Sequence, residues 1–168
     1  SANDGASWTT VPSGSTTNDQ VLGSSMVLDQ DGSLHLVQTY TWAGQHHVDL
    51  LTSSDAGLSW SRQTLRQTIE GQIALQEPGV DTDGASLLVT WRELDISTRV
   101  GGQPRGTAVA LVSDDLGATW SSPVACDSAA LSESVTSVTP AAGDGRLFVA
   151  WAVSGEAPIR VCSVELLY

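Results

Sequence analysis

Residues 53–60 read Ser-Ser-Asp-Ala-Gly-Leu-Ser-Trp, and residues 113–120 repeat the pattern as Ser-Asp-Asp-Leu-Gly-Ala-Thr-Trp. A third copy, Ser-Ala-Asn-Asp-Gly-Ala-Ser-Trp, occupies residues 1–8 and has asparagine in place of the aspartate. The aspartate can accept hydrogen bonds from N–H groups of its own loop, glycine supplies a left-handed backbone angle, and tryptophan anchors the next strand. The octet therefore predicts a tight turn between two strands. Its structural positions are Asn3, Gly5, Trp8, Asp55, Gly57, Trp60, Asp115, Gly117 and Trp120.

A second turn signal keeps the same period. Gly32, Gly84 and Gly145 each follow an aspartate and each precede an apolar run. Asp-Gly between apolar runs is a strong hairpin signal. These three glycines are 52 and 61 residues apart, and the octet glycines are 52 and 60 residues apart. The matching periods indicate three internal repeats.

Each repeat is expected to hold four short strands, and no segment has a helical period. The expected strands lie near residues 25–28, 34–40, 47–52 and 60–65, then 79–81, 87–93, 107–112 and 120–125, then 135–139, 147–152 and 159–167. Residues 96–106, with two glycines and a proline, are expected to form an inserted loop. The third repeat lacks its fourth strand, and residues 8–11 match the missing strand.

Four strands in about 40–60 residues is the size of a β-propeller blade. The predicted fold is therefore all-β, a β-propeller of four-stranded antiparallel blades with three blades in this chain. We expect one unit over residues 1–168, with repeats at about 18–70, 71–126 and 127–168, the last completed by residues 1–12.

The octet resembles the Asp-box, or BNR repeat, of sialidase-like β-propellers. In that family the box lies on the outer rim, between the third and fourth strands of a blade, and its role is structural. Sialidases of this kind have six blades. The resemblance therefore implies a homodimer in which each chain lends strand 8–11 to the third blade of the other, covering the open edge of strand 159–167. A compact three-bladed ring and a fragment of a longer propeller are the alternatives.

The charge of the chain excludes one class of partner. Its formal net charge is −12, and the seven basic residues are all arginine. Such a surface repels nucleic acid, because phosphate contacts need clusters of Lys and Arg. No apolar run is long enough to span a bilayer, so we expect no membrane partner. The chain opens at Ser1 without a methionine, which indicates a processed N-terminus and leaves a secreted or cell-surface location open.

The candidate catalytic residues come from a second resemblance to sialidases. Glu77 is followed by an Asp-Gly turn and an apolar strand that ends in Arg92. In sialidases that glutamate assists a tyrosine nucleophile, and the arginine is one of three that grip the substrate carboxylate. Tyr40 is the candidate nucleophile, since it lies on an expected inner strand. The other two arginines have no match, and a solvent-exposed strand end with local ion pairs explains Arg92 equally well.

Ligand binding is assigned to Arg92, Trp91 and Glu133. Trp91 can stack on a sugar ring, although its place near a strand end also fits core packing. Glu133 opens the third repeat much as Glu77 opens the second. The function expected is a non-catalytic, carbohydrate-binding module, with an exo-sialidase type glycoside hydrolase as the alternative.

No cofactor and no metal are expected. The adjacent histidines at 46 and 47 point to opposite faces of a strand, and the Asp-x-Asp-Gly turns lack the trailing acidic ligand of a calcium loop. Cys126 and Cys162 match no metal or redox spacing, and buried free thiols are expected in place of a bridge.

Overall fold

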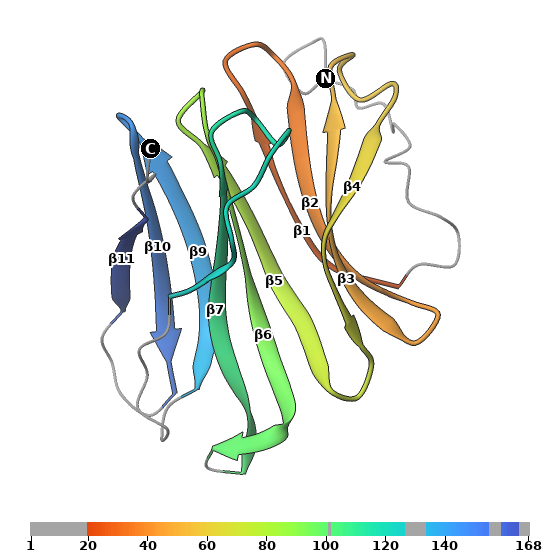
Figure 1. Ribbon diagram of the computed structural model, residues 1–168, viewed down its shortest axis with the longest axis vertical. Helices are drawn as coiled ribbons and strands as arrows, with labels where there is room; N and C mark the ends of the chain where they lie inside the picture. The colour runs from red at the N-terminus through yellow and green to blue at the C-terminus, as the bar shows by residue number, and fades with distance from the viewer. Residues whose placement is uncertain (1–19, 101, 127–133, 155–158, 165–168) are drawn as a thin grey trace, which may run out of the picture.

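A computed structural model describes residues 20–100, 102–126, 134–154 and 159–164, and these residues form three antiparallel β-sheets (Figure 1). The first sheet contains β1 (Gln20–Leu28), β2 (Leu34–Trp42), β3 (Gln45–Ser53) and β4 (Ser61–Ile69). The second contains β5 (Ile73–Thr82), β6 (Leu87–Val100), β7 (Gln103–Ser113) and β8 (Val124–Ala125). The third contains β9 (Val135–Gly143), β10 (Arg146–Val153) and β11 (Arg160–Val164). The described residues include no helix that could cross a membrane.

The three sheets share an inner edge. The strand order is sequential in every sheet, so β1, β5 and β9 are all edge strands. β1 packs beside β5, and β5 packs beside β9. The sheets therefore fan outward from these three inner strands, and in Figure 1 their strands run along the long axis. The turns within β1–β2, β3–β4, β5–β6 and β7–β8 gather at one end of the molecule, which we call the octet end.

Residue types along the strands match this arrangement. β2 and β3 are rich in Leu, Val, Thr and aromatic residues, and most of their side chains are buried on both faces. The face that carries Val37, Val48 and Leu50 is buried against the second sheet, and Val, Thr and aromatic residues suit such a pleated surface. β4 reads Ser-Arg-Gln-Thr-Leu-Arg-Gln-Thr-Ile and is mostly exposed, as suits the outer edge of a sheet.

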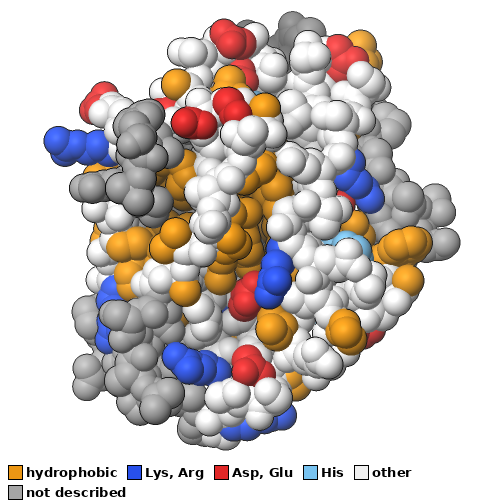
Figure 2. Space-filling view, viewed as in Figure 1, with side chains coloured by type: hydrophobic (Ala, Val, Ile, Leu, Met, Phe, Trp, Pro, Cys, Tyr) orange, Lys and Arg blue, Asp and Glu red, His pale blue; other side chains and the backbone are white. Residues whose placement is uncertain are grey.

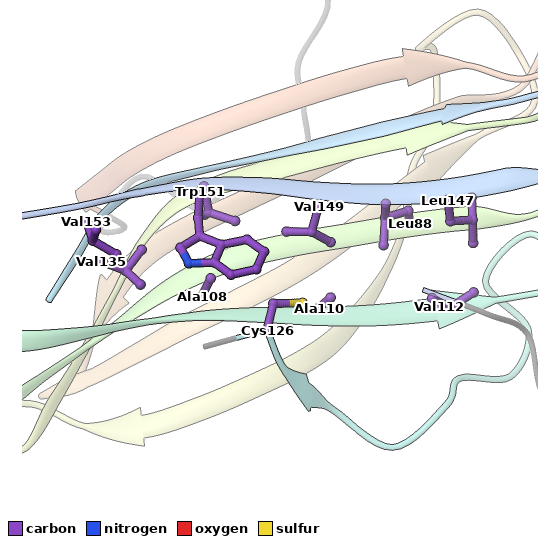
Figure 3. Close-up of a cluster of buried hydrophobic side chains, with 11 residues drawn as sticks. Leu88, Ala108, Ala110, Val112, Cys126, Val135, Leu147, Val149, Trp151 and Val153 are labelled. Atoms are coloured by element: carbon purple, nitrogen blue, oxygen red, sulfur yellow. The ribbon is translucent and has the colours of Figure 1, made fainter. Parts of the chain in front are cut away.

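Two apolar clusters join the sheets. The first seam lies between the first and second sheets, and its buried residues include Val37, Val48, Leu50, Leu75, Leu87, Val89, Trp91, Val109 and Leu111. The second seam lies between the second and third sheets (Figure 3), and its buried residues include Leu88, Ala108, Ala110, Val112, Cys126, Val135, Leu147, Val149, Trp151 and Val153. The second sheet thus contributes one face to each cluster, and the packing is a stack of three layers.

The two described octets form the predicted turns, between β3 and β4 and between β7 and β8. Asp55 Oδ1 accepts the N–H of Ser59 at 2.8 Å, and its Oδ2 accepts the Ser59 hydroxyl at 2.6 Å. Asp115 repeats both contacts with Thr119, at 2.7 and 2.6 Å. The hydrogen bond from the Ser59 or Thr119 hydroxyl has the larger effect and that from the N–H of the same residue the next, and together they lower the pKa of each aspartate to about 2. Gly57 and Gly117 have φ of 88° and 100°, which explains the glycine at that position.

The tryptophans of the two octets anchor the turns differently. Trp120 packs against the first seam and its Nε1 donates to Gln63 on β4 at 3.2 Å. Trp60 donates to the carbonyl of Gly57 in its own turn at 3.0 Å. The third octet, with Asn3, Gly5 and Trp8, lies outside the described residues.

Two strand predictions were wrong. The expected strand 120–125 is reduced to Val124–Ala125, because residues 121–123 after the second octet make no ladder. The expected loop 96–106 is instead the end of a hairpin, since β6 and β7 continue to Val100 and Gln103. Both strands pair across this region, with a bulge between Asp95 and Arg99. The exchange strand 8–11 lies outside the described residues.

Candidate functional site

A groove of about 310 Å³ opens on the face of the second sheet that looks toward the first sheet. It is lined by Ile73, Glu93, Asp95, Arg105, Thr107 and Ala125. These residues come from all four strands of the sheet, and the ladder explains why they meet. Ile73, Asp95 and Arg105 are directly opposite one another on β5, β6 and β7, and Glu93 is opposite Thr107. Side chains at opposed ladder positions share one face. The groove lies toward the end opposite the octets.

Glu93 is positioned from two sides. Its Oε1 accepts the Arg66 Nε at 2.9 Å, and it accepts the indole N–H of Trp91 at 3.2 Å. Arg66 lies on β4 of the first sheet, so this ion pair crosses the first seam beside the groove. In Figure 2, acidic and basic side chains lie side by side near the middle of the face, next to a band of apolar surface. The pair fixes one carboxylate oxygen at the groove wall.

Asp95 and Arg105 form the other polar wall. Asp95 Oδ1 accepts the Ser97 hydroxyl at 2.6 Å and the N–H groups of Ser97 and Thr98 at 2.9 and 3.2 Å. These bonds, the Ser97 hydroxyl first, lower the pKa of Asp95 to about 2. Arg105 makes no ion pair within the described part of the chain, and its buried Nε has no hydrogen-bond partner there. A guanidinium with unused donors therefore faces the groove.

The predicted residues Glu77 and Arg92 are brought together, but at the second seam. Arg92 Nη2 lies 3.0 Å from Glu77 Oε1 and donates to Gln76 Oε1 at 2.7 Å. Its Nη1 donates to the carbonyl of Thr136 on β9 at 2.8 Å. Glu77 has φ of 53° in a bulge of β5. Arg92 thus ties the inner strands of the second and third sheets together, and its terminal nitrogens are already engaged by protein groups.

Tyr40 lies far from this pair in the fold. It is on the face of the first sheet that points away from the second, and it is 5% exposed. Its hydroxyl donates to the fully buried Asp49 at 2.8 Å, and its ring stacks on His47 with centroids 4.8 Å apart. The first sheet separates Tyr40 from Glu77 and Arg92. The three expected catalytic residues therefore do not form one site in this chain.

Trp91 and Glu133 have different outcomes. Trp91 has no exposed surface and packs in the first seam. A direct contact of Trp91 with a ligand does not fit this packing. Its indole N–H instead donates a hydrogen bond to the Glu93 carboxylate. Glu133 lies outside the described residues. The described residues hold no group of His, Cys, Asp and Glu that could bind a metal ion.

Solved structures of fungal enzymes resemble this chain. An α-L-arabinanase of Penicillium chrysogenum, complexed with arabinobiose, is 15% identical over 77% of this chain and 40% of its own, with a TM-score of 0.59. The GH93 α-L-arabinofuranosidase of Fusarium graminearum, complexed with arabinobiose, has the same identity and coverage and a TM-score of 0.57. A Fusarium graminearum arabinofuranosidase with an iminosugar inhibitor is 12% identical over 88% of this chain and 60% of its own, with a TM-score of 0.53.

The chain has a β-propeller fold. No protein-family model and no curated protein matches the sequence. The three sheets are blades, and β1, β5 and β9 are their inner strands. The chain spans 40% of the length of the two enzymes complexed with arabinobiose. Identities of 12–15% establish the fold and nothing finer.

The groove between the first and second blades was missed by sequence reasoning. Trp91, Glu93 and Asp95 occupy every second position of β6, so their side chains lie on one face of the blade. Arg105 was hidden because residues 96–106 were assigned to a loop. This spacing of Trp91, Glu93 and Asp95 was the one sequence signal that could have revealed the acidic side of the groove.

Proposed function

We propose that this propeller is a carbohydrate-binding module of the sialidase-like, Asp-box type, and that the groove beside Glu93 and Arg105 is its sugar site. The observation that carries the proposal is the unpaired Arg105 guanidinium facing two carboxylates across one small groove. Small-molecule sites are concave and have a few convergent polar groups. The octet turns and the propeller neighbours support the class of protein.

The chemistry of the groove favours an uncharged sugar over an acidic one. Glu93 and Asp95 face it with Arg105, and Arg66 pairs with Glu93, so acidic and basic groups balance. A sugar hydroxyl can donate to a carboxylate and accept from a guanidinium. An anionic sugar would meet both carboxylates. The arabinobiose bound by the structural neighbours makes arabinan oligosaccharides the first ligands to try.

Binding without hydrolysis fits the groove better than catalysis. Glycoside hydrolysis commonly needs two carboxyl groups, one of which must carry a proton to the leaving oxygen. Asp95, with a pKa of about 2, is a carboxylate at neutral pH. Glu93 Oε1 is already taken by Arg66 and Trp91. Neither group is arranged as a proton donor.

Titration of the protein with arabinobiose and longer arabinan oligosaccharides, followed by calorimetry, tests this function. Arg105→Ala is expected to weaken binding about 10- to 100-fold, since a hydrogen bond to a charged group is worth about 1.5–3 kcal/mol. Arg99→Ala is the matched control, because Arg99 is exposed in the β6–β7 hairpin and its Nη1 donates to the Gly102 carbonyl. It should bind as the unaltered protein does.

Other outcomes point elsewhere. Equal binding by both variants would move the site away from the groove, and no binding to arabinans or to a glycan array would refute a carbohydrate function. Release of arabinose that stops in Glu93→Gln would identify a hydrolase. Hydrolysis of a fluorogenic sialoside that stops in Arg92→Ala would restore the sialidase alternative.

We further propose that two copies of the chain close one six-bladed ring. The outward face of the first blade carries the exposed Met26 and Leu28, and that of the third carries the exposed Val161, at 58, 60 and 61%. Exposed apolar blade faces favour association, and a two-fold dimer would bring each first blade against the third blade of its partner.

Light scattering over a range of concentrations measures this assembly. The expected mass is twice the 17.5 kDa of the chain. Val161→Asp should shift the mass toward one copy, because it places a charge on the proposed contact. A mass of 17.5 kDa at all concentrations would be contrary to the closed ring.

A further inference from the structure

Two cysteines 36 positions apart in sequence meet at the second seam. Cys126 directly follows β8 on the outer edge of the second blade, and its N–H donates to the Ala108 carbonyl at 2.9 Å. Cys162 lies on β11 of the third blade, directly opposite Val149 of β10. Both thiols are free in this structure. Cys126 is buried, as expected, and Cys162 is half-buried.

Their side chains face the same apolar cluster. Cys126 is part of the second seam with Ala110, Val149 and Trp151 around it (Figure 3). Cys162 packs against this cluster from the third blade. Burial, together with a hydrogen bond to the Cys162 thiol, raises the pKa of the Cys126 thiol to about 12. Cys162 is the ladder partner of Val149, and Val149 and Cys126 belong to one buried cluster, which also holds the small side chains of Ala108 and Ala110. The two cysteines therefore enter the seam from adjoining blades.

We propose that Cys126 and Cys162 form a disulfide that staples the second blade to the third under oxidising conditions. The contact joins segments of different blades, and its backbone on both sides is held by ladder or backbone hydrogen bonds. The two cysteines approach one cluster from facing blades, and a disulfide requires that two such side chains can point at each other.

The oxidant is a small-molecule disulfide, and the two cysteines have unequal roles. The half-buried Cys162 loses its proton and attacks one sulfur of the oxidant, forming a mixed disulfide and releasing one thiolate. The sulfur of Cys126 then loses its proton and attacks the Cys162 sulfur, which expels the second thiolate. The protein loses two hydrogens, and the oxidant is reduced to two thiols. Cys162 reacts first because a buried thiol with a raised pKa is a poor nucleophile.

The disulfide would act at a blade edge that is held by a short ladder. β8 has only two residues, so the outer edge of the second blade is held to β7 by a short ladder. Ala125 of β8 also lines the groove. A covalent link at Cys126 would hold this edge against the third blade and restrict the unfolded chain through a loop of about 36 residues.

The test compares the full chain after incubation with oxidised glutathione and after reduction with dithiothreitol. The oxidised protein is expected to be lighter by two hydrogens, with a tryptic peptide pair joining Cys126 to Cys162. Its melting temperature should rise by about 5–10 °C, as expected for a disulfide in a chain of this size. Iodoacetamide applied briefly to the reduced protein should label Cys162 before Cys126.

Cys162→Ser is the control variant, since its side chain is half-buried and the substitution is small. It should melt near the reduced protein and show no change on oxidation. A stable glutathione adduct at Cys162, a cross-link between two chains, or two free thiols after unfolding would each refute the staple. The peptide map of the unaltered protein decides the matter even if a variant folds poorly.

Discussion

Trp91→Ala is expected to lower the free energy of unfolding by about 3–5 kcal/mol, the range for a large aromatic side chain removed from a core. Trp91 is wholly buried in the first seam, together with Leu75, Val89 and Val109. The two blades beside Trp91 are each held by their own ladder hydrogen bonds, so they cannot close the cavity that its removal leaves. The loss therefore includes both the transfer term and the cavity term.

Two comparison variants separate packing from the groove. Trp91→Phe retains most of the volume but leaves Glu93 without its indole donor, so we expect a smaller loss of stability with weakened sugar binding. Trp42→Ala removes a tryptophan that is 51% exposed and should cost about 1 kcal/mol or less. Urea unfolding followed by circular dichroism measures all three. Equal losses at Trp91 and Trp42 would contradict the burial of Trp91.

Gly79→Ala is expected to cost about 3 kcal/mol by overpacking the contact between two inner strands. A Cβ on Gly79 would clash with Pro140 Cδ on β9 and would lie 2.8 Å from Thr90 Oγ1 on β6. The proline ring is rigid, so the second and third blades would have to separate. The first blade repeats the contact, since a Cβ on Gly23 would lie 2.9 Å from Pro78 Cδ.

Gly143→Ala is the matched control for this prediction. A Cβ at Gly143 meets nothing within 4 Å, and the residue has an ordinary negative φ. That substitution should leave stability unchanged or raise it slightly, because alanine has fewer unfolded conformations than glycine. Thermal unfolding of the two variants under identical conditions is the measurement. If both behaved alike, close approach of the inner strands would not be the reason for the glycine.

Local turns were predictable because their bonds close within a few residues. Asp55 and Ser59 are four positions apart, as are Asp115 and Thr119. A side chain that finds its partners in its own loop leaves a readable signature, whatever the rest of the chain does. The three repeats and the four-strand order of the first two blades followed from those turns, and the structure confirmed them.

The groove could not be predicted in the same way. It depends on how far β6 and β7 continue and on their register, which places Arg105 opposite Asp95. Gly and Pro in residues 96–106 favour a loop locally, yet pairing across the hairpin overrides that preference. The role of Arg92 likewise depends on the Thr136 carbonyl, which is 44 positions away.

The sequence by itself determined the all-β class, the repeat and the octet turns, since each of these rests on periodicity and on bonds within one loop. Only the tertiary structure decided which groups meet across a seam: Arg66 meets Glu93, Arg92 meets the Thr136 carbonyl, and Cys126 and Cys162 pack in one apolar cluster. These contacts join different blades, and blade packing depends on the shape and volume of whole faces. A pattern of residue types along one strand carries no record of what the next blade places against it.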